Sequence, residues 1–452
     1  MEYHDPFGLY SLVAKQLSAV LPLRDLHWKS ATRPLRSINS LHVEFIAAQD
    51  VDRPGSRHGA GNIEHSSPAR TPAERRHQIP GLRQTPYLKV FLLRCDDSET
   101  YKSSVRKLLR EWLKAHTPAS QNSSVRSSQE NHDAFEWLIL HVVLPNTQAA
   151  SQPRTSSSSS KSETASSEKS GSSSKLLGRS STTILEKLKA DFNLSSKSTP
   201  DRVEQVRLRA EDLPASIVPA RPSSGAADWV DTAHDYLRAW QDLTAKLKTL
   251  ILATFSLRVS QYEDDIRERE SQRLLPGWNF CTFFMLKEGL LRGFESVGLI
   301  DDALIGYDEL SLGMDNLIAD ADDDGTTTRS DSFLKYTKEM KDILLQCLTS
   351  ESTPDVIWKD STQLISTTRK DYRNLIVNSN VSAFDFRSYV FARQVAILVR
   401  MSTSDRSEHM ESVSQCPAKG PQELAALSEL CHRTLSFLSA ACRTLKAELS
   451  AA

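Results

Sequence analysis

Residues 278–318 read WNFCTFFMLKEGLLRGFESVGLIDDALIGYDELSLGMDNLI, and this stretch decides the fold of the C-terminal half. Its apolar residues recur every three or four positions on either side of Gly298, which is the spacing of amphipathic helices. The residues that share a face are Phe280, Phe283, Phe284, Leu290, Leu291 and Phe294 in the first segment, and Ile300, Ala303, Leu304, Tyr307, Leu310, Met314 and Leu317 in the second. We therefore predict two helices, 278–294 and 299–318, that form an antiparallel hairpin.

The same helical periodicity extends to both sides of this hairpin. One long helix is predicted from Asp228 to just before Pro276, and four more at 332–348, 354–376, 382–401 and 421–449, with Ser382 and Pro421 at helix starts. The hairpin resembles a tetratricopeptide (TPR) unit, although no second copy follows at a fixed period. We predict an α-solenoid of TPR-like helical hairpins over residues 223–452. Its last helix keeps an apolar stripe that needs a facing layer. This layer is either the neighbouring helix, onto which the last helix packs backwards, or a next repeat that continues the solenoid beyond this chain or in a partner.

The first half has a different pattern, in which short apolar segments alternate with helices. Strands are predicted at 41–47, 87–95, 136–144 and 203–208, the last at a sheet edge, and helices at 101–116 and 184–192, with Ser98 as the first N-cap. A strand, a helix and a strand in this order indicate a parallel crossover. The fold class is thus mainly α, with an N-terminal α/β domain followed by helices.

Two tracts of low complexity interrupt that domain. Residues 51–85 are rich in Pro, Gly, Arg and His, and residues 146–183 are dominated by Ser. Such tracts bury too little apolar surface to offset their ordering entropy, so both are predicted to be flexible insertions. The α/β domain then comprises residues 1–145 and 184–222.

Composition excludes several classes of function. The chain has 452 residues, and its 56 basic and 57 acidic side chains nearly cancel, so no overall field attracts nucleic acid. The charges are unevenly placed, with an acidic stretch at 295–331 and a basic stretch at 24–36. The six cysteines show no close pairing, which favours a reducing compartment. Neither a signal peptide nor a membrane span is evident, so we expect any membrane association to be peripheral.

One acidic segment has the spacing of a metal site. Asp320, Asp322, Asp324 and Gly325 match the first half of an EF-hand loop, but position twelve is Asp331 instead of Glu. A solvated acidic loop is favoured over calcium binding, and no cofactor is expected. No nucleophile elbow, phosphate-binding loop or zinc-protease motif is present. Asp96 and Asp97 follow a predicted strand, where we favour a helix start over a ligand site.

A cluster of aromatic and cationic residues near the N-terminus suggests an interface. Trp28, Arg33 and Arg36 are residue types that are enriched among interface anchors, and we favour packing or a protein contact over lipid or nucleic acid.

Three segments carry a family resemblance. LHWKSATRPLRSINSLHV (26–43), FFMLKEGLLRGFESVGLIDDALIGYDELSLGMDNL (283–317) and KDYRNLIVNSNVSAFDFRSYVFARQVAIL (370–398) resemble the TRAPP II-specific large tethering subunit, the transport protein particle subunit ten family. The segments add Tyr307, Arg387 and Arg393 to the interface candidates.

The resemblance implies a non-catalytic scaffold in a complex at Golgi and endosomal membranes. That complex tethers vesicles and promotes nucleotide exchange on Rab-type small GTPases, and its small core subunits perform the exchange. Implied partners are the other TRAPP subunits, a Rab-type GTPase through the complex, and the cytoplasmic face of the Golgi membrane. Family members are larger, with β-sandwich domains beyond the solenoid, so this chain stops inside the helical part.

Two other classes of function remain open. One is an unrelated helical-repeat adaptor with a calcium-regulated acidic loop, and the other is a degenerate nucleotide-binding enzyme that uses the α/β half. Calcium-dependent stabilisation would favour the adaptor, and nucleotide binding to residues 1–220 would favour the enzyme.

Overall fold

The structure is a computed structural model of the whole chain. It describes residues 1–30, 32–48, 85–116, 132–152, 183–193, 200–214, 216–219, 233–323, 333–334, 337–339, 341–342, 370–404 and 421–451. The chain forms two compact units, the first from residues 1–77 with 85–258 and the second from 78–84 with 259–452. The division falls inside helix α6 (Ala233–Ser271), the long helix that the sequence predicted.

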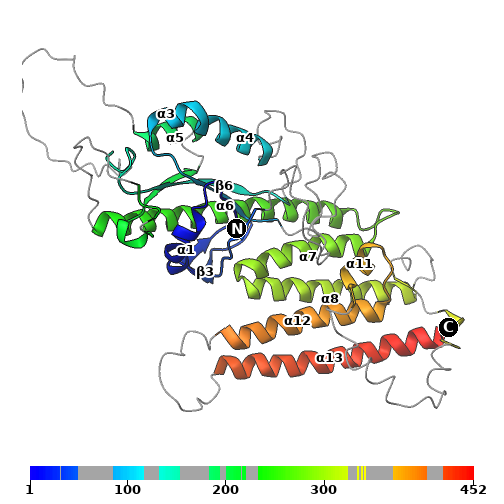
Figure 1. Cartoon of the computed structure of the whole chain (residues 1–452). Helices are drawn as coiled ribbons and strands as arrows, with labels where there is room; N and C mark the ends of the chain where they lie inside the picture. Colours follow the sequence, from blue (N-terminus) through cyan, green and yellow to red (C-terminus); the bar gives the residue numbers. More distant parts are fainter. Residues whose placement is uncertain are drawn as a thin grey trace, which may run out of the picture. The chain divides into compact units, whose positions relative to one another are not determined.

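A five-stranded parallel sheet forms the centre of the first unit (Figure 1). Its strands are β1 (Glu2–His4), β4 (Ile46–Ala47), β5 (Leu88–Leu93), β6 (Glu136–Val143) and β7 (Val203–Arg207), in the order β4-β1-β5-β6-β7. Counted along the chain, this is the order 2-1-3-4-5 of a doubly wound α/β sheet. The central strands β5 and β6 are apolar on both faces because helices cover both sides.

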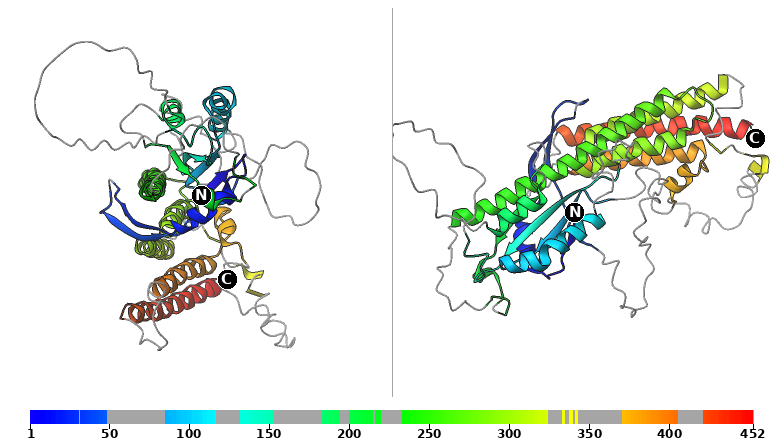
Figure 2. Two further views of the ribbon diagram at one scale, coloured as in Figure 1. Left: turned by 60° about the vertical axis from the view of Figure 1, so that its left-hand side comes forward. Right: turned by 90° about the horizontal axis from the view of Figure 1, so that it is seen from above.

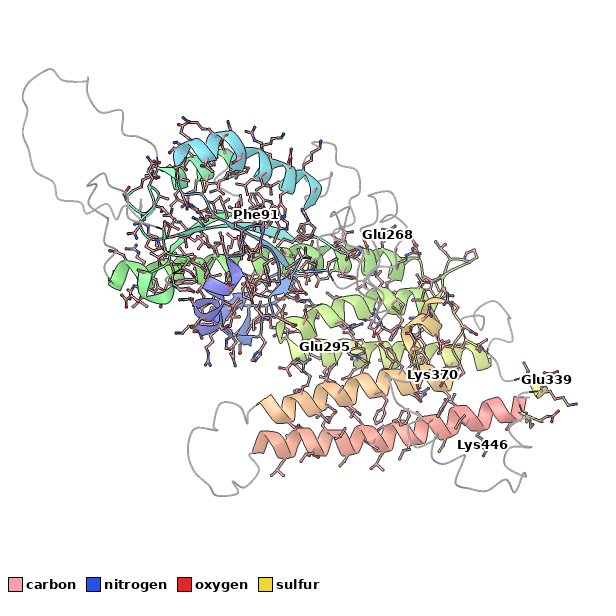
Figure 3. All side chains as sticks on the ribbon, in the orientation of Figure 1. Phe91, Glu268, Glu295, Glu339, Lys370 and Lys446 are labelled. Carbon is pink, nitrogen blue, oxygen red and sulfur yellow. The ribbon has the colours of Figure 1, made fainter. Side chains whose placement is uncertain are left out.

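Helices lie on both faces of this sheet (Figure 2). One face is covered by α4 (Arg106–His116), which continues from α3 (Ser98–Thr100) and the π-helix η1 (Tyr101–Val105), and by α5 (Ile184–Phe192). Phe91, labelled in Figure 3, is fully buried in the core on that side. On the opposite face, α1 (Tyr10–Ala19) and the first part of α6 pack on side chains of β5 and β6.

The structure confirms most of the predicted α/β elements and corrects others. The strands at 87–95, 136–144 and 203–208 and both helices are present, and β7 lies at the sheet edge. The N-cap of α3 is Asp97 and not Ser98, because the Asp97 carboxylate accepts the Glu99 and Thr100 amide hydrogens at 2.9 and 2.7 Å. The strand predicted at 41–47 is wrong, since only Ile46–Ala47 of it joins the sheet.

A separate two-stranded antiparallel hairpin follows α1. It consists of β2 (Leu23–Trp28) and β3 (Arg36–Leu41), and the sequence did not predict it. A short 3-10 helix, η3 (Ala210–Asp212), follows β7.

The described part of the second unit is helical. Helices α7 (Phe280–Val297), α8 (Ile300–Asp323), α12 (Ala383–Ser404) and α13 (Pro421–Ala451) contact one another in succession, and the short α11 (Tyr372–Val377) lies against α7 and α12 (Figure 1). Gly298, at a φ of 86°, ends α7 and lets α8 fold back, which confirms the predicted hairpin.

The helix starts that the sequence predicted further along are also confirmed. Ser382 caps α12 by accepting the Asp385 amide hydrogen at 3.1 Å, and Pro421 is the first residue of α13. The helices predicted at 332–348 and 354–376 fall mostly outside the described residues, apart from α11 at the end of the second.

Candidate functional site

The β2–β3 hairpin is fixed to helix α6 by one apolar face. Leu23 and Leu26 of β2 are buried opposite Leu41 and Ile38 of β3. Trp28, which is 2% exposed, packs on the Phe255 ring with centroids 4.9 Å apart, and its indole Nε1 donates to Ser256 Oγ at 2.9 Å. Trp28 is thus an internal anchor for the hairpin.

The hairpin also presents an exposed basic rim. Arg24, His27 and Lys29 are exposed, and Leu35 at the turn is 62% exposed. Arg33 and Arg36 are half-buried beside Leu35, so the structure brings these two candidates together at the end of the hairpin. Leu35, Arg33 and Arg36 therefore lie at the surface at least in part, whereas Trp28 is buried and packs the hairpin against α6.

In the second unit, a buried carboxylate joins three helices. Glu288 of α7 is fully buried, and its Oε2 accepts a hydrogen bond from Arg373 Nε of α11 at 3.0 Å. Its other oxygen accepts a short hydrogen bond from the Tyr389 hydroxyl of α12. Burial and the negative charge of Glu288 raise the pKa of Tyr389 well above its ordinary value, so the phenol stays protonated and donates.

A second ion pair lies further along the same helices. Arg393 Nη2 of α12 contacts both carboxylate oxygens of Glu295, which Figure 3 labels in α7, at 2.6 and 2.7 Å. The Arg393 Nε donates to the Tyr307 hydroxyl of α8 at 3.1 Å. Burial alone lowers the pKa of Arg393, but Tyr307 and Glu295 raise it above the ordinary value. This triad joins α7, α8 and α12.

A third set of charges connects α8 to α12 and α13. Asp308 accepts from Gln394 Nε2 and from Arg433 Nη2, each at 2.8 Å, and Arg387 Nη1 lies 2.6 Å from Asp315 Oδ1. The three sets together span α7, α8, α11, α12 and α13. The buried carboxylate of Glu288 and the largely buried one of Glu295 favour one register of α7 with α11 and α12, because a buried charge is stable only beside its partner.

The predicted candidates in this unit therefore have partners within the chain. Tyr307 is fully buried, and Arg387 and Arg393 pair with carboxylates of α8 and α7. Contact between these residues and another subunit stays a prediction. Sequence reasoning missed Glu288 and Arg373, because an isolated Glu in an apolar helix gives no sign of its partner 85 residues away.

The acidic segment is only partly described. Asp320 and Asp322 belong to helix α8, whereas Asp324 and Asp331 lie outside the described residues. Within the described part of the chain, no group of three or more His, Cys, Asp or Glu is placed to hold a metal ion.

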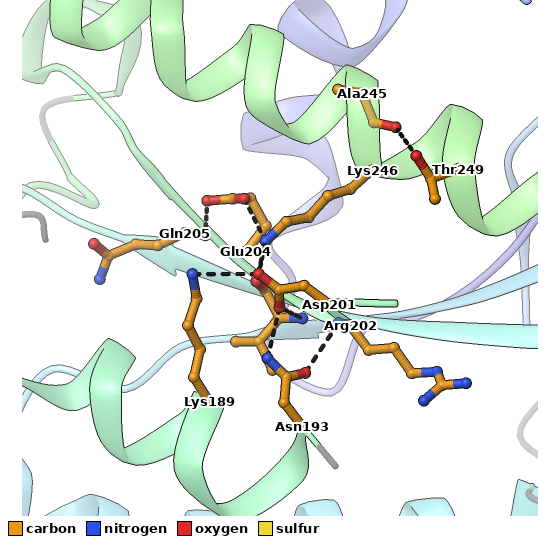
Figure 4. A network of polar contacts seen from close by, with 10 residues as sticks. Lys189, Asn193, Asp201, Arg202, Glu204, Gln205, Ala245, Lys246 and Thr249 are labelled. Carbon is orange, nitrogen blue, oxygen red and sulfur yellow. Dashed lines mark hydrogen bonds and ion pairs between the residues drawn. The ribbon is translucent and has the colours of Figure 1, made fainter. Parts of the chain in front are cut away.

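A polar network supports the edge strand β7 in the first unit (Figure 4). Asp201 Oδ2 accepts from Lys246 Nζ of α6 at 2.6 Å, and its Oδ1 accepts from Asn193 Nδ2 after α5 at 2.6 Å. Lys246 also lies 2.7 Å from Glu204. Burial pushes the pKa of Asp201 upward, but the hydrogen bond and charge of Lys246 outweigh it and lower the pKa to about 2.

The titratable groups near the carboxyl ends of strands β5 and β6 make contacts within the fold. Burial raises the pKa of the Cys95 thiol to about 12, so it is protonated at neutral pH and a poor nucleophile. Burial lowers the pKa of His141 to about 4, and this ring contacts the Cys95 carbonyl and Gln205 at 3.0 Å. Asp97 caps a helix, as the sequence predicted for this acidic pair. These groups therefore contact one another or cap a helix within the fold.

No helix among the described residues is long and apolar enough to cross a bilayer.

Comparison with known proteins relates this chain to a family of trafficking subunits. Residues 1–159, which include the hairpin, match the family described as "Trafficking protein particle complex subunit 10-like, N-terminal". The chain is 26% identical over 406 residues to trafficking protein particle complex subunit 10 of Dictyostelium discoideum, and 25% identical over 395 residues to that of Homo sapiens. These matches confirm the resemblance to the trafficking particle's large subunit that the sequence suggested.

Another match covers a shorter segment, and the longer matches cover only part of the relatives. A 73-residue segment is 49% identical to the trafficking protein particle complex II-specific subunit 130 homolog of Arabidopsis thaliana, covering 16% of this chain and 6% of that protein. The Dictyostelium and human matches cover 88% and 87% of this chain but only 22% and 23% of the relatives, so the chain spans less than a quarter of their length. No solved structure matches.

The three segments that carry the resemblance occupy defined elements. Residues 26–43 form the end of β2 and all of β3, residues 283–317 form most of the α7–α8 hairpin, and residues 370–398 form α11 and most of α12. The second and third segments supply Glu288, Arg373, Glu295 and Arg393.

Proposed function

We propose that this chain acts as a non-catalytic scaffold subunit of a TRAPP II-like vesicle-tethering complex. The observation that carries the proposal is the similarity of the chain to subunit 10-like proteins, whose names make them subunits of a trafficking particle. The geometry is consistent with a scaffold, because three sets of charged side chains in the described second unit join one helix to another. The chain would act by binding and by holding other subunits in position.

The helical region is proposed to be an α-solenoid of TPR-like hairpins. Helices α7, α8, α12 and α13 each contact the next, which is the contact pattern of a quasi-one-dimensional array. Such arrays expose long surfaces, and long surfaces suit a subunit that contacts several partners.

The proposed partners are other subunits of the trafficking particle and, through the complex, a Rab-type small GTPase. In this proposal the small core subunits perform nucleotide exchange, and this chain supplies no exchange activity of its own. The proposed location is the cytoplasmic surface of Golgi and endosomal membranes, with peripheral attachment. No cofactor enters the proposal.

The hairpin end is the proposed contact in the first unit. Leu35, Arg33 and Arg36 form an apolar and cationic group, a combination that suits interface anchors. Arg24 is exposed elsewhere on the same hairpin and provides a matched control for charge.

The test is reconstitution with purified small core subunits of a trafficking particle. We expect the purified full chain to co-sediment with that core. When the core subunits are left out, adding the chain to a Rab-type GTPase should leave the rate of nucleotide release unchanged. Arg33→Glu with Leu35→Glu should weaken co-sedimentation, whereas Arg24→Glu should not. Failure of the wild-type chain to co-sediment, or exchange activity of the chain alone, would contradict the proposal.

A further inference from the structure

Helix α4 presents a cationic face to solvent. Lys107, Arg110 and Lys114 are exposed, and they follow one another at steps of three and four residues. At about 100° per residue, their side chains lie within a sector of about 60° around the helix axis and extend over roughly 10 Å of its length. Buried Leu109 and Trp112 lie on the opposite side of the helix, so the cationic sector faces away from the sheet that α4 covers in Figure 1.

The charge of this face is only partly compensated within the described part of the chain. Arg110 and Lys114 form no ion pair with a described residue. Lys107 lies 3.8 Å from Glu111, which is the one carboxylate within residues 106–116. An exposed pair at that distance is weak and is screened by salt. Three cations and one carboxylate leave the face with a net charge of +2 at neutral pH.

The same face offers no apolar anchor for a protein partner. Leu108 and Leu113 on its flanks are half-buried and pack on the core. Within residues 98–116, all of which the structure describes, no large apolar side chain is exposed. Protein interfaces usually have a central apolar or aromatic anchor, and the hairpin end has such a residue in Leu35. A purely cationic face suits a surface of many anionic groups, which need no match atom by atom.

Phospholipid headgroups fit this face better than nucleic acid does. Binding of single strands uses exposed aromatic side chains for base stacking, and Tyr101 and Trp112 of this segment are buried. Helices that recognise a duplex enter its major groove, whereas α4 lies along the sheet with its apolar side packed in the core. Cations on such a helix reach a flat anionic surface without insertion, and each strengthens adsorption by about fivefold.

We propose that the outward face of α4 binds the headgroups of anionic phospholipids at a bilayer surface, through Lys107, Arg110 and Lys114. This inference deepens the proposed function, because it assigns the peripheral membrane contact to one face of one helix. The apolar side of α4 is occupied by the core, so the contact is electrostatic and reversible and leaves the helix outside the hydrocarbon layer.

The test is flotation of the purified full chain with phosphatidylcholine vesicles that contain about one third phosphatidylserine. Vesicles of phosphatidylcholine alone are the neutral reference. We expect the chain to bind the anionic vesicles and not the neutral ones. Binding should disappear as added salt shortens the Debye length from about 10 Å at 0.1 M to about 3 Å at 1 M ionic strength.

A triple variant measures the contribution of the face. Lys107→Gln, Arg110→Gln and Lys114→Gln together should weaken binding to the anionic vesicles by about 100-fold, since each cation contributes about fivefold. Glutamine has nearly the helix propensity of lysine and arginine, so α4 should be retained.

The matched control removes the same number of exposed cations elsewhere in the first unit. Lys15→Gln, Arg24→Gln and Lys29→Gln change α1 and the hairpin, which pack on the other side of the sheet and on α6. This control should change vesicle binding by less than about twofold, because salt screens exposed charges beyond a Debye length.

A third variant predicts a gain instead of a loss. Glu111→Gln removes the carboxylate from the cationic face and should strengthen binding to the anionic vesicles by about fivefold. A folding defect cannot produce this gain, so the variant separates the proposed contact from a general loss of structure.

Three outcomes would overturn the proposal. They are equal or absent binding of the wild-type chain to the two kinds of vesicle, equal losses in the triple variant and its matched control, and tighter binding of the wild-type chain to double-stranded DNA than to anionic vesicles at the same phosphate concentration. The flotation assay contains only the purified chain and vesicles. Its failure is therefore distinguishable from a failure to co-sediment with the small core subunits, which tests the proposed function.

Discussion

Replacing Glu288 by alanine should loosen the second unit more than any exposed substitution there. The change leaves the Arg373 guanidinium, whose side chain is 16% exposed, and the buried Tyr389 hydroxyl without their shared acceptor. Breaking a buried pair by removing one partner costs roughly 3–5 kcal/mol. Because Arg373 is near the surface and can partly rehydrate, we expect the lower end, about 3 kcal/mol.

Hydrogen exchange of the full chain measures this loss locally. A destabilisation of about 3 kcal/mol should accelerate exchange of amides in α7 and α12 by roughly 150-fold. Amides of β5 and β6 provide an internal reference. The matched control is Glu270→Ala, which removes an exposed carboxylate of α6 and should change stability by less than about 0.5 kcal/mol. If Glu288→Ala and Glu270→Ala gave the same exchange rates in α7, the reasoning about a buried, paired carboxylate would be refuted.

Three further predictions follow from the packing. Trp28→Ala should destabilise the first unit by about 3–5 kcal/mol in thermal unfolding, whereas Leu35→Ala, at the exposed turn, should change it little. Asp201→Asn should cost about 1 kcal/mol at pH 7, after allowance for partial exposure. Because the folded pKa is depressed, this difference should persist above pH 4 and vanish as pH falls toward 2 in urea titrations. Gly306→Ala would place a Cβ 2.1 Å from Leu291 Cδ2, so we expect about 1–3 kcal/mol of destabilisation in the same titration unless Leu291 rotates away.

The helices and the central strands could be predicted because their signals are local. The α7–α8 hairpin follows from apolar spacing and from Gly298, and strands β5 and β6 follow from long apolar runs. Strand β1 has only three residues, which is too short for any periodicity.

The β2–β3 hairpin was missed for a physical reason. Asp25 adopts a φ of 56°, which a short polar side chain tolerates, and the buried positions Leu23, Leu26 and Trp28 then fall three and two residues apart. Strict alternation, the usual signal for a half-buried strand, is therefore broken in this segment.

The polar contacts in the helical unit could not be read from sequence. Glu288 meets Arg373 and Tyr389 across 85 and 101 residues, and no local pattern connects them. In contrast, the sequence did identify the apolar stripe of the last helix, and the structure shows that Leu424, Leu435 and Leu438 of this stripe are exposed.

The central claim is that the chain works as part of a trafficking particle, and purification from cells tests it most directly. The tagged full chain would be isolated at its natural abundance and its co-purifying proteins quantified by mass spectrometry. The account predicts recovery of the small core subunits of a trafficking particle in fixed ratio to the bait. An intact, abundant bait that brings down none of them would contradict it.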